Sequence, residues 1–272
     1  MSELIRGMVV GSPVSHSLSP VLHRSAFEFL GVSGEYSRCD VPAQTFASFF
    51  TSAQESHDYF SITMPLKEEA LALPVQIDPL AKRIQSANTL YKRAGEWHLT
   101  STDGSGLLSA LGHHGLDRFN KVLVLGAGGT ARAVVGALDG VTQSISVLGR
   151  SSTRRDALNA SVIDSDFQYL RWSDNPDFEE YDMVINTTPA GDADILADSL
   201  IPGKCSLLFD VIYKPWPTVL ASRWSDCGGE VISGLELLLY QAIAQLELVL
   251  ARELDHEAMA AHLRPILLSA SQ

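Results

Sequence analysis

The sequence is short of cysteine and of positive charge. Its 272 residues include three cysteines, Cys39, Cys205 and Cys227, with no Cys-x-x-Cys pair. This odd number and spacing argue against a disulfide framework or a cysteine metal site, so we expect free thiols, a reducing compartment and no bound metal. The net charge is −12. Nucleic acids and anionic membranes bind basic surfaces, so we expect neither as a partner, whereas a small anionic substrate depends on local charge.

Long hydrophobic runs are also missing. The most apolar stretch, 235–250, is interrupted by Glu236, Gln241, Gln245 and Glu247, which predicts a buried helix instead of a membrane span. The first residues lack the apolar core of a signal peptide, so we expect a soluble, cytoplasmic protein. The absence of a short-period repeat excludes a solenoid.

A glycine-rich turn stands at the centre of what the chain does contain. Residues 121–125, Lys-Val-Leu-Val-Leu, are typical of a strand buried in a parallel sheet, and the apolar run 131–138 predicts a helix. Between them, Gly126 allows a tight turn, Gly128 allows a pyrophosphate to approach, and Ala131 allows helix–sheet packing. A glycine triplet alone is often a plain turn, but a strand before it and a helix after it favour dinucleotide binding.

The next strand of this unit, 144–148, lacks the acidic residue that holds the ribose hydroxyls of NAD. It is followed by Gly149-Arg150-Ser151-Ser152-Thr153-Arg154-Arg155. Guanidinium groups beside hydroxyls suit a ribose 2′-phosphate, although a solvated basic turn is the alternative. We therefore predict NADP as the cofactor. Two later buried strands, 183–186 and 206–211, end in polar residues such as Asn186 and Thr187, where open α/β sheets bind ligands.

Lys67 conflicts with a local rule. A strand at 59–63 leads into Pro65, and the helix that follows carries Glu68 and Glu69 in its first turn. The helix dipole disfavours a cation at this end, and such conflicts are expected at functional sites. The alternative is an exposed lysine paired with an acid one turn further on.

Other polar residues of the first hundred are candidates for a binding site. Ser17 and Ser19 precede a helix that we expect to begin at Pro20, with Ser19 as its N-cap, and to end at Gly31. Their hydroxyls could hold a carboxylate, or Ser19 could serve as a cap alone. Asn88 stands at the start of a strand. Asp103 lies in a polar, glycine-rich exit before a helix at 107–111, and it could be only a helix cap.

Taken in order, these motifs resemble those of the shikimate dehydrogenase family over nearly the whole chain. The corresponding segments are Gly11–Pro20, Thr63–Lys67, Ser86–Leu90, Ser101–Gly104, Gly126–Arg132, Gly149–Arg154, Asp210–Tyr213 and the helix with Gln241. The resemblance implies reversible, NADPH-dependent reduction of 3-dehydroshikimate to shikimate, a step towards chorismate and the aromatic amino acids.

The resemblance also implies site residues. Lys67 and Asp103 would be the catalytic pair. The substrate would contact Ser17, Ser19, Thr63, Lys67, Asn88, Asp103, Tyr213 and Gln241. The cofactor would contact Gly126, Ala127, Gly128, Gly129, Thr130, Ala131, Arg150, Ser151, Arg154, Asn186, Thr187, Val211 and Gly234. A positioned ammonium can stabilise the charge that develops on a ketone oxygen during hydride transfer and can deliver a proton to it.

Three positions depart from the family pattern. Ser61 and Ser101 stand where many members have Asn, and Glu236-Leu237 replaces the common Gly-Met. A paralogue acting on quinate or another hydroxylated cyclic acid is therefore an alternative. A catalytically silent NADPH-binding regulator is a second one, against which the presence of both Lys67 and Asp103 argues.

The expected fold class is α/β with two α/β domains. Residues 1–105 would form the substrate-binding domain, joined by returning C-terminal helices in 237–272. Residues 106–236 would form a Rossmann-like, doubly wound NADP-binding domain, and the site would lie in the cleft between them. The expected state is a monomer or a homodimer.

Overall fold

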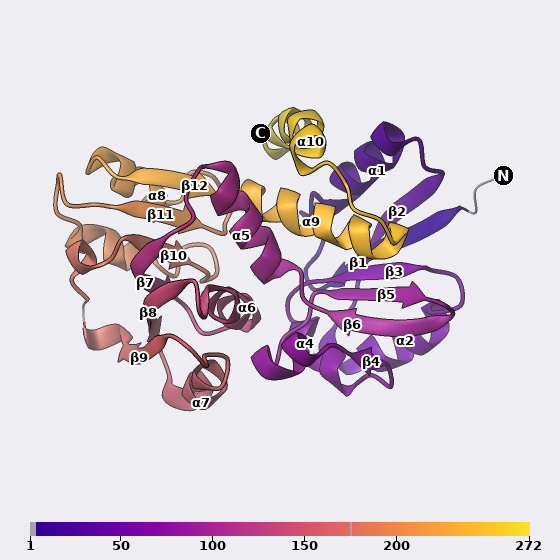
Figure 1. Ribbon diagram of the computed structural model, residues 1–272, viewed down its shortest axis with the longest axis horizontal. Helices are drawn as coiled ribbons and strands as arrows, with labels where there is room; N and C mark the ends of the chain where they lie inside the picture. The colour runs from indigo at the N-terminus through magenta and orange to yellow at the C-terminus, as the bar shows by residue number, and fades with distance from the viewer. Residues whose placement is uncertain (1–3, 175) are drawn as a thin grey trace. The chain divides into compact units, whose positions relative to one another are not determined.

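In the computed structural model, which describes residues 4–174 and 176–272, the chain divides into two units. Unit 1 comprises Met1–Gly106 and Leu238–Gln272, and unit 2 comprises Leu107–Leu237. Both combine helices with a sheet (Figure 1), so the expected α/β class is confirmed.

Unit 2 is built on a parallel sheet with the strand order β12-β11-β10-β7-β8-β9. Its strands are β7 (Phe119–Leu125), β8 (Thr142–Gly149), β9 (Asp166–Arg171), β10 (Met183–Asn186), β11 (Leu207–Asp210) and β12 (Glu230–Ser233). Its helices are α6 (Gly129–Leu138), α7 (Arg155–Asn159) and α8 (Val219–Asp226). The order reverses between β7 and β10, so the expected doubly wound topology is confirmed, with a switch point beside the glycine-rich turn.

The interior strands of this sheet form because they can be buried on both faces. Residues 122–125 of β7 and all of β10 and β11 are buried. Leu123, Leu125 and Leu148 pack with Val184, Leu208 and Trp224 in one hydrophobic cluster. Helix α6 begins at Gly129, two residues before the expected start, so the backbone N–H groups of its first turn follow the glycine turn directly.

Unit 1 contains a mixed sheet with the order β2-β1-β3-β5-β6-β4. Its strands are β1 (Ile5–Gly11), β2 (Gly34–Asp40), β3 (Tyr59–Ile62), β4 (Gln76–Ile77), β5 (Thr89–Arg93) and β6 (Glu96–Thr100). Helices α1 (Ser19–Leu30), α2 (Phe46–Ala53), α3 (Leu66–Glu69), α4 (Pro79–Ile84) and α10 (His256–Ser271) belong to the same unit. Strands β5 and β6 form an antiparallel hairpin, and Asn88 directly precedes β5.

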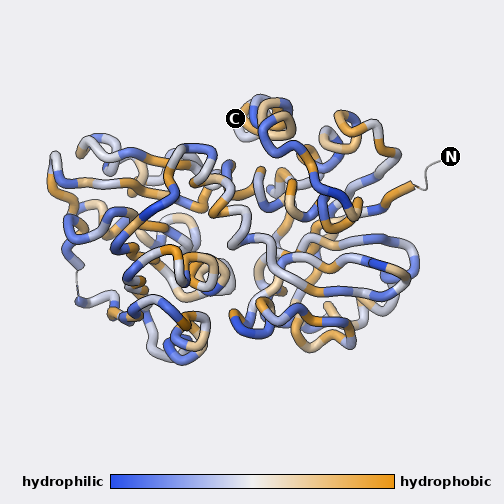
Figure 2. Tube along the Cα trace, viewed as in Figure 1, coloured by the Kyte–Doolittle hydropathy of each residue, from blue (hydrophilic) through white to orange (hydrophobic). Residues whose placement is uncertain are grey.

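The C-terminal helices return to unit 1, as expected. Helix α10 packs on α1, and the rings of Phe29 and His262 stack with centroids 4.4 Å apart. Helix α9 (Gly234–Leu250) contacts the strands through Gln245. Hydrophilic positions interrupt α9 along its length (Figure 2). Among the described residues, no helix is both long enough and apolar enough to cross a membrane.

Two further expected helix starts are wrong. Helix α1 begins at Ser19, and Leu18 occupies the N-cap position, where its apolar side chain cannot accept a hydrogen bond. The hydroxyl of Ser17 accepts from the Ser19 N–H at 3.3 Å. Helix α5 (Asp103–His113) begins four residues before the expected Leu107. The residues 103–106 are therefore helical, and both dividing points between the units lie inside helices, in α5 and α9.

Candidate active site

Lys67 is held by short backbone contacts on both sides. At the end of β3, Thr63 N–H donates to the carbonyl of Val10, and Leu66 N–H donates to the carbonyl of Thr63, each at 2.9 Å. The carbonyl of Lys67 accepts from Ala87 N–H at 2.9 Å, which fixes the segment that carries Asn88 beside it. The second residue of α3 is therefore anchored to two neighbouring segments of unit 1.

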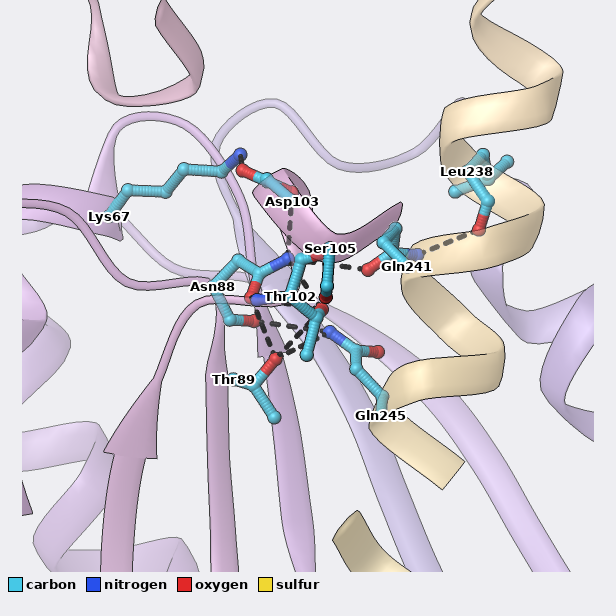
Figure 3. A network of polar contacts seen from close by, with 9 residues as sticks. All are labelled: Lys67, Asn88, Thr89, Thr102, Asp103, Ser105, Leu238, Gln241 and Gln245. Atoms are coloured by element: carbon cyan, nitrogen blue, oxygen red, sulfur yellow. Dashed lines mark hydrogen bonds and ion pairs between the residues drawn. The ribbon is translucent and has the colours of Figure 1, made fainter. Parts of the chain in front are cut away.

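The Lys67 ammonium forms an ion pair with Asp103 Oδ2 (Figure 3). The side chains are 16% and 7% exposed, so most of the pair is shielded from water. The alternative of an exposed lysine paired with an acid one turn away does not describe this side chain. A charge pair in this setting interacts more strongly than a surface pair and holds its geometry.

Asn88 is the centre of the hydrogen bonds around this pair. Its Nδ2 donates to Asp103 Oδ1 at 2.7 Å and to Thr102 Oγ1 at 3.1 Å. Its Oδ1 accepts from Thr102 N–H and from the Thr89 hydroxyl, both at 2.7 Å. Figure 3 shows these groups converging from the ends of β5 and β6. The two oxygens of Asp103 thus have separate partners, Lys67 and Asn88.

Helix α9 supplies Gln241 to the same group. Gln241 Nε2 donates to the carbonyl of Leu238 at 2.9 Å, and its Oε1 faces Asn88 Nδ2 at 3.4 Å. Gly106 of α5 makes this approach possible, because a Cβ there would lie 2.7 Å from the backbone nitrogen of Gln241. The structure therefore brings together four of the predicted substrate residues: Lys67, Asn88, Asp103 and Gln241.

The hydroxyl-rich loop that carries Ser17 and Ser19 is joined to the Lys67 segment by its backbone. Ser12 N–H donates to the carbonyl of Met64 at 2.9 Å, and the Ser12 hydroxyl donates to Asp40 at 2.7 Å. Ser19 is 5% exposed, and Ser17 is half-buried. Thr63, which directly precedes Met64, is half-buried.

In unit 2, the predicted cofactor residues Gly126–Ala131, Asn186 and Thr187 lie at the carboxyl ends of β7 and β10. Gly126 has a φ of +103°, and a Cβ there would lie 2.7 Å from Thr187 Oγ1. Only glycine meets both demands without strain. Thr187 Oγ1 donates to the carbonyl of Leu125 at 2.7 Å, which ties the ends of the two strands together. Ala127, Gly128, Gly129 and Thr130 follow this turn and are half-buried, and Ala131 is buried.

The basic turn after β8 is held by residues that the sequence did not single out. Arg150 forms an ion pair with Asp192, which lies in the loop after β10. Tyr169 of β9 donates its hydroxyl to the carbonyl of Ser151 at 2.6 Å. The Arg154 guanidinium lies beside Gly128. Arg150, Ser151 and Arg154 are exposed, so an anion could reach them beside the start of α6.

The side chain of Asn186 is buried and makes three hydrogen bonds. Its Nδ2 donates to Asp210 at 3.0 Å, and its Oδ1 accepts from Thr188 N–H and from the Thr188 hydroxyl. Burial raises the pKa of Asp210, and hydrogen bonds from Thr218, Ile212 and Asn186 oppose the shift. This cluster fixes the start of the loop that carries Val211 and Tyr213.

Further along that loop, Gly234 N–H donates to the carbonyl of Ile212 at 3.3 Å, and Gly234 packs against the backbone of Val211. Tyr213 is half-buried, and among the predicted substrate residues it is the member found in unit 2.

Across residues 4–174 and 176–272, no group of three or more His, Cys, Asp or Glu side chains is arranged to hold a metal ion. Chemically, the unit 1 site offers an ammonium paired with a carboxylate and surrounded by amides and hydroxyls. Such a site can donate a proton to an oxygen and stabilise negative charge on it.

Comparison with known proteins agrees with this geometry. The family model described as the shikimate dehydrogenase substrate binding domain matches residues 9–90. A shikimate dehydrogenase (NADP(+)) of Thermosynechococcus vestitus is 33% identical, over 95% of this chain and 94% of that protein. A second one, from Exiguobacterium sp., is 31% identical over 88% and 90%.

Solved structures are similar as well. The shikimate dehydrogenase of Mycobacterium tuberculosis superposes with a TM-score of 0.84 at 33% identity, covering 96% of this chain and 99% of that one. A Thermus thermophilus enzyme, solved in complex with NADP(H) and shikimate, gives 0.81 at 29% identity over 96% and 99%. With relatives above 30% identity matching nearly end to end, the chain belongs to the shikimate dehydrogenase family.

Proposed function

We propose that this protein is an NADP-dependent oxidoreductase that catalyses the reversible reduction of 3-dehydroshikimate to shikimate. The observation that carries the proposal is the shielded Lys67–Asp103 pair, to which Asn88 donates a hydrogen bond, in a chain that belongs to this family. In this role a domain formed by residues 1–105 with the helices of 237–272 binds the substrate, and a domain formed by residues 106–236 binds the cofactor.

Lys67 acts on the oxygen of the reacting carbonyl. When bound, NADPH supplies the hydride that reaches the carbonyl carbon. As negative charge grows on the oxygen, the Lys67 ammonium stabilises it and transfers a proton to it. Asp103 keeps the ammonium in place through Oδ2, while Asn88 orients the carboxylate through Oδ1. In the reverse direction the same amine accepts the proton of the alcohol.

Ser17, Ser19 and Thr63 orient the substrate at a distance from the reacting carbon. Serine hydroxyls and the N–H groups near the start of α1 suit a carboxylate, and binding it there aligns the ring for hydride transfer. Asn88, Gln241 and Tyr213 contact ring hydroxyls in this scheme.

The geometry of unit 2 supports the proposed cofactor residues. The turn Gly126–Ala131 at the start of α6 receives the pyrophosphate, and Arg150, Ser151 and Arg154 receive the 2′-phosphate. Thr187, Val211, Gly234 and the backbone of Asn186 line the nicotinamide end. The exposed guanidiniums fit the extra phosphate of NADP, and no acidic side chain ends β8.

A rate comparison tests the proposal. Oxidation of shikimate and of quinate is measured with NADP⁺ and with NAD⁺, and we expect shikimate with NADP⁺ to have the highest kcat/KM. A preference for quinate would assign the protein to the paralogous activity. NADPH binding without turnover of either acid would identify a non-catalytic regulator.

We further propose that the protein acts in the cytoplasm as a monomer or a homodimer. Cys39, Cys205 and Cys227 are free thiols, which suits a reducing compartment. Sedimentation equilibrium separates the two oligomeric states.

A further inference from the structure

Behind Asn88 lies a second buried amide, Gln245 of α9, which the proposed reaction does not use. Its side chain has no exposure to solvent. Its Nε2 donates to Thr89 Oγ1 at 2.9 Å and to the carbonyl of Asn88 at 3.3 Å, and its Oε1 accepts from the Ser61 hydroxyl at 2.7 Å. Figure 3 shows Gln245 reaching from α9 towards Thr89 and Asn88. A fully buried amide with partners at both ends is held in one orientation.

The chemistry of its neighbours fixes which end of the amide points where. The carbonyl of Asn88 can only accept a hydrogen bond, so the atom of Gln245 that faces it is the NH₂ group. The oxygen must then face Ser61. The Ser61 hydroxyl accepts a hydrogen bond from the Tyr36 phenol at 2.6 Å and donates one to Gln245 Oε1 at 2.7 Å. Burial raises the pKa of Tyr36 well above its usual value, so this phenol remains a donor.

The hydrogen bonds between Gln245 and the Lys67–Asp103 ion pair also have a fixed donor-to-acceptor direction. Because Thr89 Oγ1 accepts from Gln245, its own hydrogen is directed to Asn88 Oδ1 at 2.7 Å. That oxygen is thereby held towards Thr89 and Thr102, and the NH₂ of Asn88 is held towards Asp103. Each step places a donor on one side and an acceptor on the other, from Tyr36 to the carboxylate that holds Lys67.

We propose that Gln245 is a positioning residue for the Lys67–Asp103 pair and acts through Thr89 and Asn88. The hydrogen bond from Ser61 fixes the orientation of its amide. Ser61 is one of the three departures from the family pattern, and its hydrogen bond to Gln245 gives that departure a role. The inference rests on the proposed function, because the pair that Gln245 positions is the one assigned to catalysis.

The test uses the single-turnover rate of hydride transfer, which product release does not mask. Gln245→Met removes both polar ends at similar length, and we expect this rate to fall about tenfold or more, since small misplacements of catalytic groups are costly. NADPH affinity should stay within about twofold of wild type, because the cofactor residues belong to unit 2. Ile243→Met is the matched control: Ile243 is equally buried on the same helix but makes no polar contact through its side chain.

A second pair of variants separates positioning from packing. Thr89→Val removes the hydroxyl and should lower the same rate as Gln245→Met does, whereas Thr89→Ser keeps it and should restore the rate to within about twofold of wild type. The double variant Gln245→Met/Thr89→Val should be no slower than the slower single variant. The inference would be overturned if Gln245→Met lowered the single-turnover rate no more than Ile243→Met does, or if Thr89→Ser did not restore this rate. Additive losses in the double variant would also overturn it. The proposed function fails separately, if the wild-type protein does not oxidise shikimate.

Discussion

At the scale of single residues, the site depends on giving each polar atom one partner of the right kind. Asp103 Oδ2 accepts from the Lys67 ammonium, and Oδ1 accepts from the NH₂ of Asn88, so each carboxylate oxygen has its own hydrogen-bond donor. Removing one partner of a shielded ion pair leaves the other charge without compensation, which costs more than the pair itself contributes. The effects of substitutions at Lys67 and Asp103 are therefore expected to be linked.

Lys67→Met tests the central assignment, because Met is similar in length and carries no charge. We expect kcat to fall by about a hundredfold or more, the range for losing a general acid or a donor to the developing oxyanion. NADPH affinity should barely change. The measurements are steady-state kinetics with shikimate and a fluorescence titration with NADPH. Near-normal turnover by the folded variant would contradict the assignment.

Asp103→Asn tests the carboxylate that pairs with Lys67. It keeps the shape of the side chain but removes the charge that holds the ammonium, so turnover should fall as well. If the two residues act as a unit, Lys67→Met/Asp103→Asn will lose less than the product of the single losses. Fully multiplicative losses would mean that the two residues act independently.

At the scale of elements, the turn after β8 is shaped by β9 and by the loop after β10. Tyr169 fixes the backbone at Ser151, and Asp192 holds the side chain of Arg150. The side chain of Arg150 is 62% exposed, so its ion pair with Asp192 is a surface pair in which the two side chains attract each other only modestly. Tyr169 and Asp192 thus order the turn, while the side chains of Arg150 and Arg154 are exposed to solvent.

Arg150→Ala should weaken NADPH binding selectively. Loss of one charge-assisted contact to a phosphate corresponds to about 1–3 kcal/mol. NADH has no 2′-phosphate, so its Kd should change little. Calorimetric titration with both cofactors measures the difference, and equal losses for the two would place the 2′-phosphate elsewhere.

Asp192→Asn should have the opposite effect. The carboxylate competes with the 2′-phosphate for Arg150, and removing its charge frees the guanidinium. We expect NADPH to bind roughly two- to fivefold more tightly, the range of an exposed pair. Raised salt should shrink this gain. Weaker binding in the variant would mean that Asp192 aims Arg150 at the phosphate instead of competing with it.

Element by element, the sequence predicted the interior strands of unit 2 and missed its edges. β7, β8, β10 and β11 are buried on both faces, so their apolar runs stand out. β9 and β12 lie at the two edges of the sheet. Their burial is partial, and β9, Asp-Phe-Gln-Tyr-Leu-Arg, contains only exposed and half-buried positions. An edge strand needs no continuous apolar run, so its sequence does not separate it from a loop.

At the scale of the whole molecule, the sequence pointed to residues but not to their partners. Lys67, Asn88 and Asp103 were found through local motifs, whereas the bond between Ser61 and Gln245 joins positions 184 residues apart. Gln241 and Gln245 were visible as polar interruptions of the apolar run 235–250, yet their helical spacing could not show which strands would supply their hydrogen-bond partners. Tyr169 and Asp192 carried no signal, since each acts only where the fold places it beside the basic turn.

Stability towards acid offers a further prediction, centred on His23 of α1. The ring is fully buried, stacks on Tyr36 with centroids 4.1 Å apart, and shares a 2.8 Å hydrogen bond with the hydroxyl of Tyr59. Burial lowers the pKa of His23 from 6.5 to about 3, and contact with the Gln245 amide opposes the shift. Below pH 6.5 the unfolded chain protonates this histidine, whereas the folded chain does not until about pH 3. The unfolded state then binds more protons, so stability falls as the pH drops through this window.

Each pH unit in that window is worth about 1.4 kcal/mol for one such group. When the pH is lowered to about 4.5, the free energy of unfolding of the wild type should therefore fall by on the order of 3 kcal/mol more than that of His23→Gln, whose side chain cannot ionise. Urea unfolding at a series of pH values measures both proteins, and the subtraction removes the shared titration of surface carboxylates. Above neutral pH the difference between them should be constant, because the histidine is uncharged in both states. Parallel curves at acid pH would mean that His23 is already accessible to protons in the folded protein.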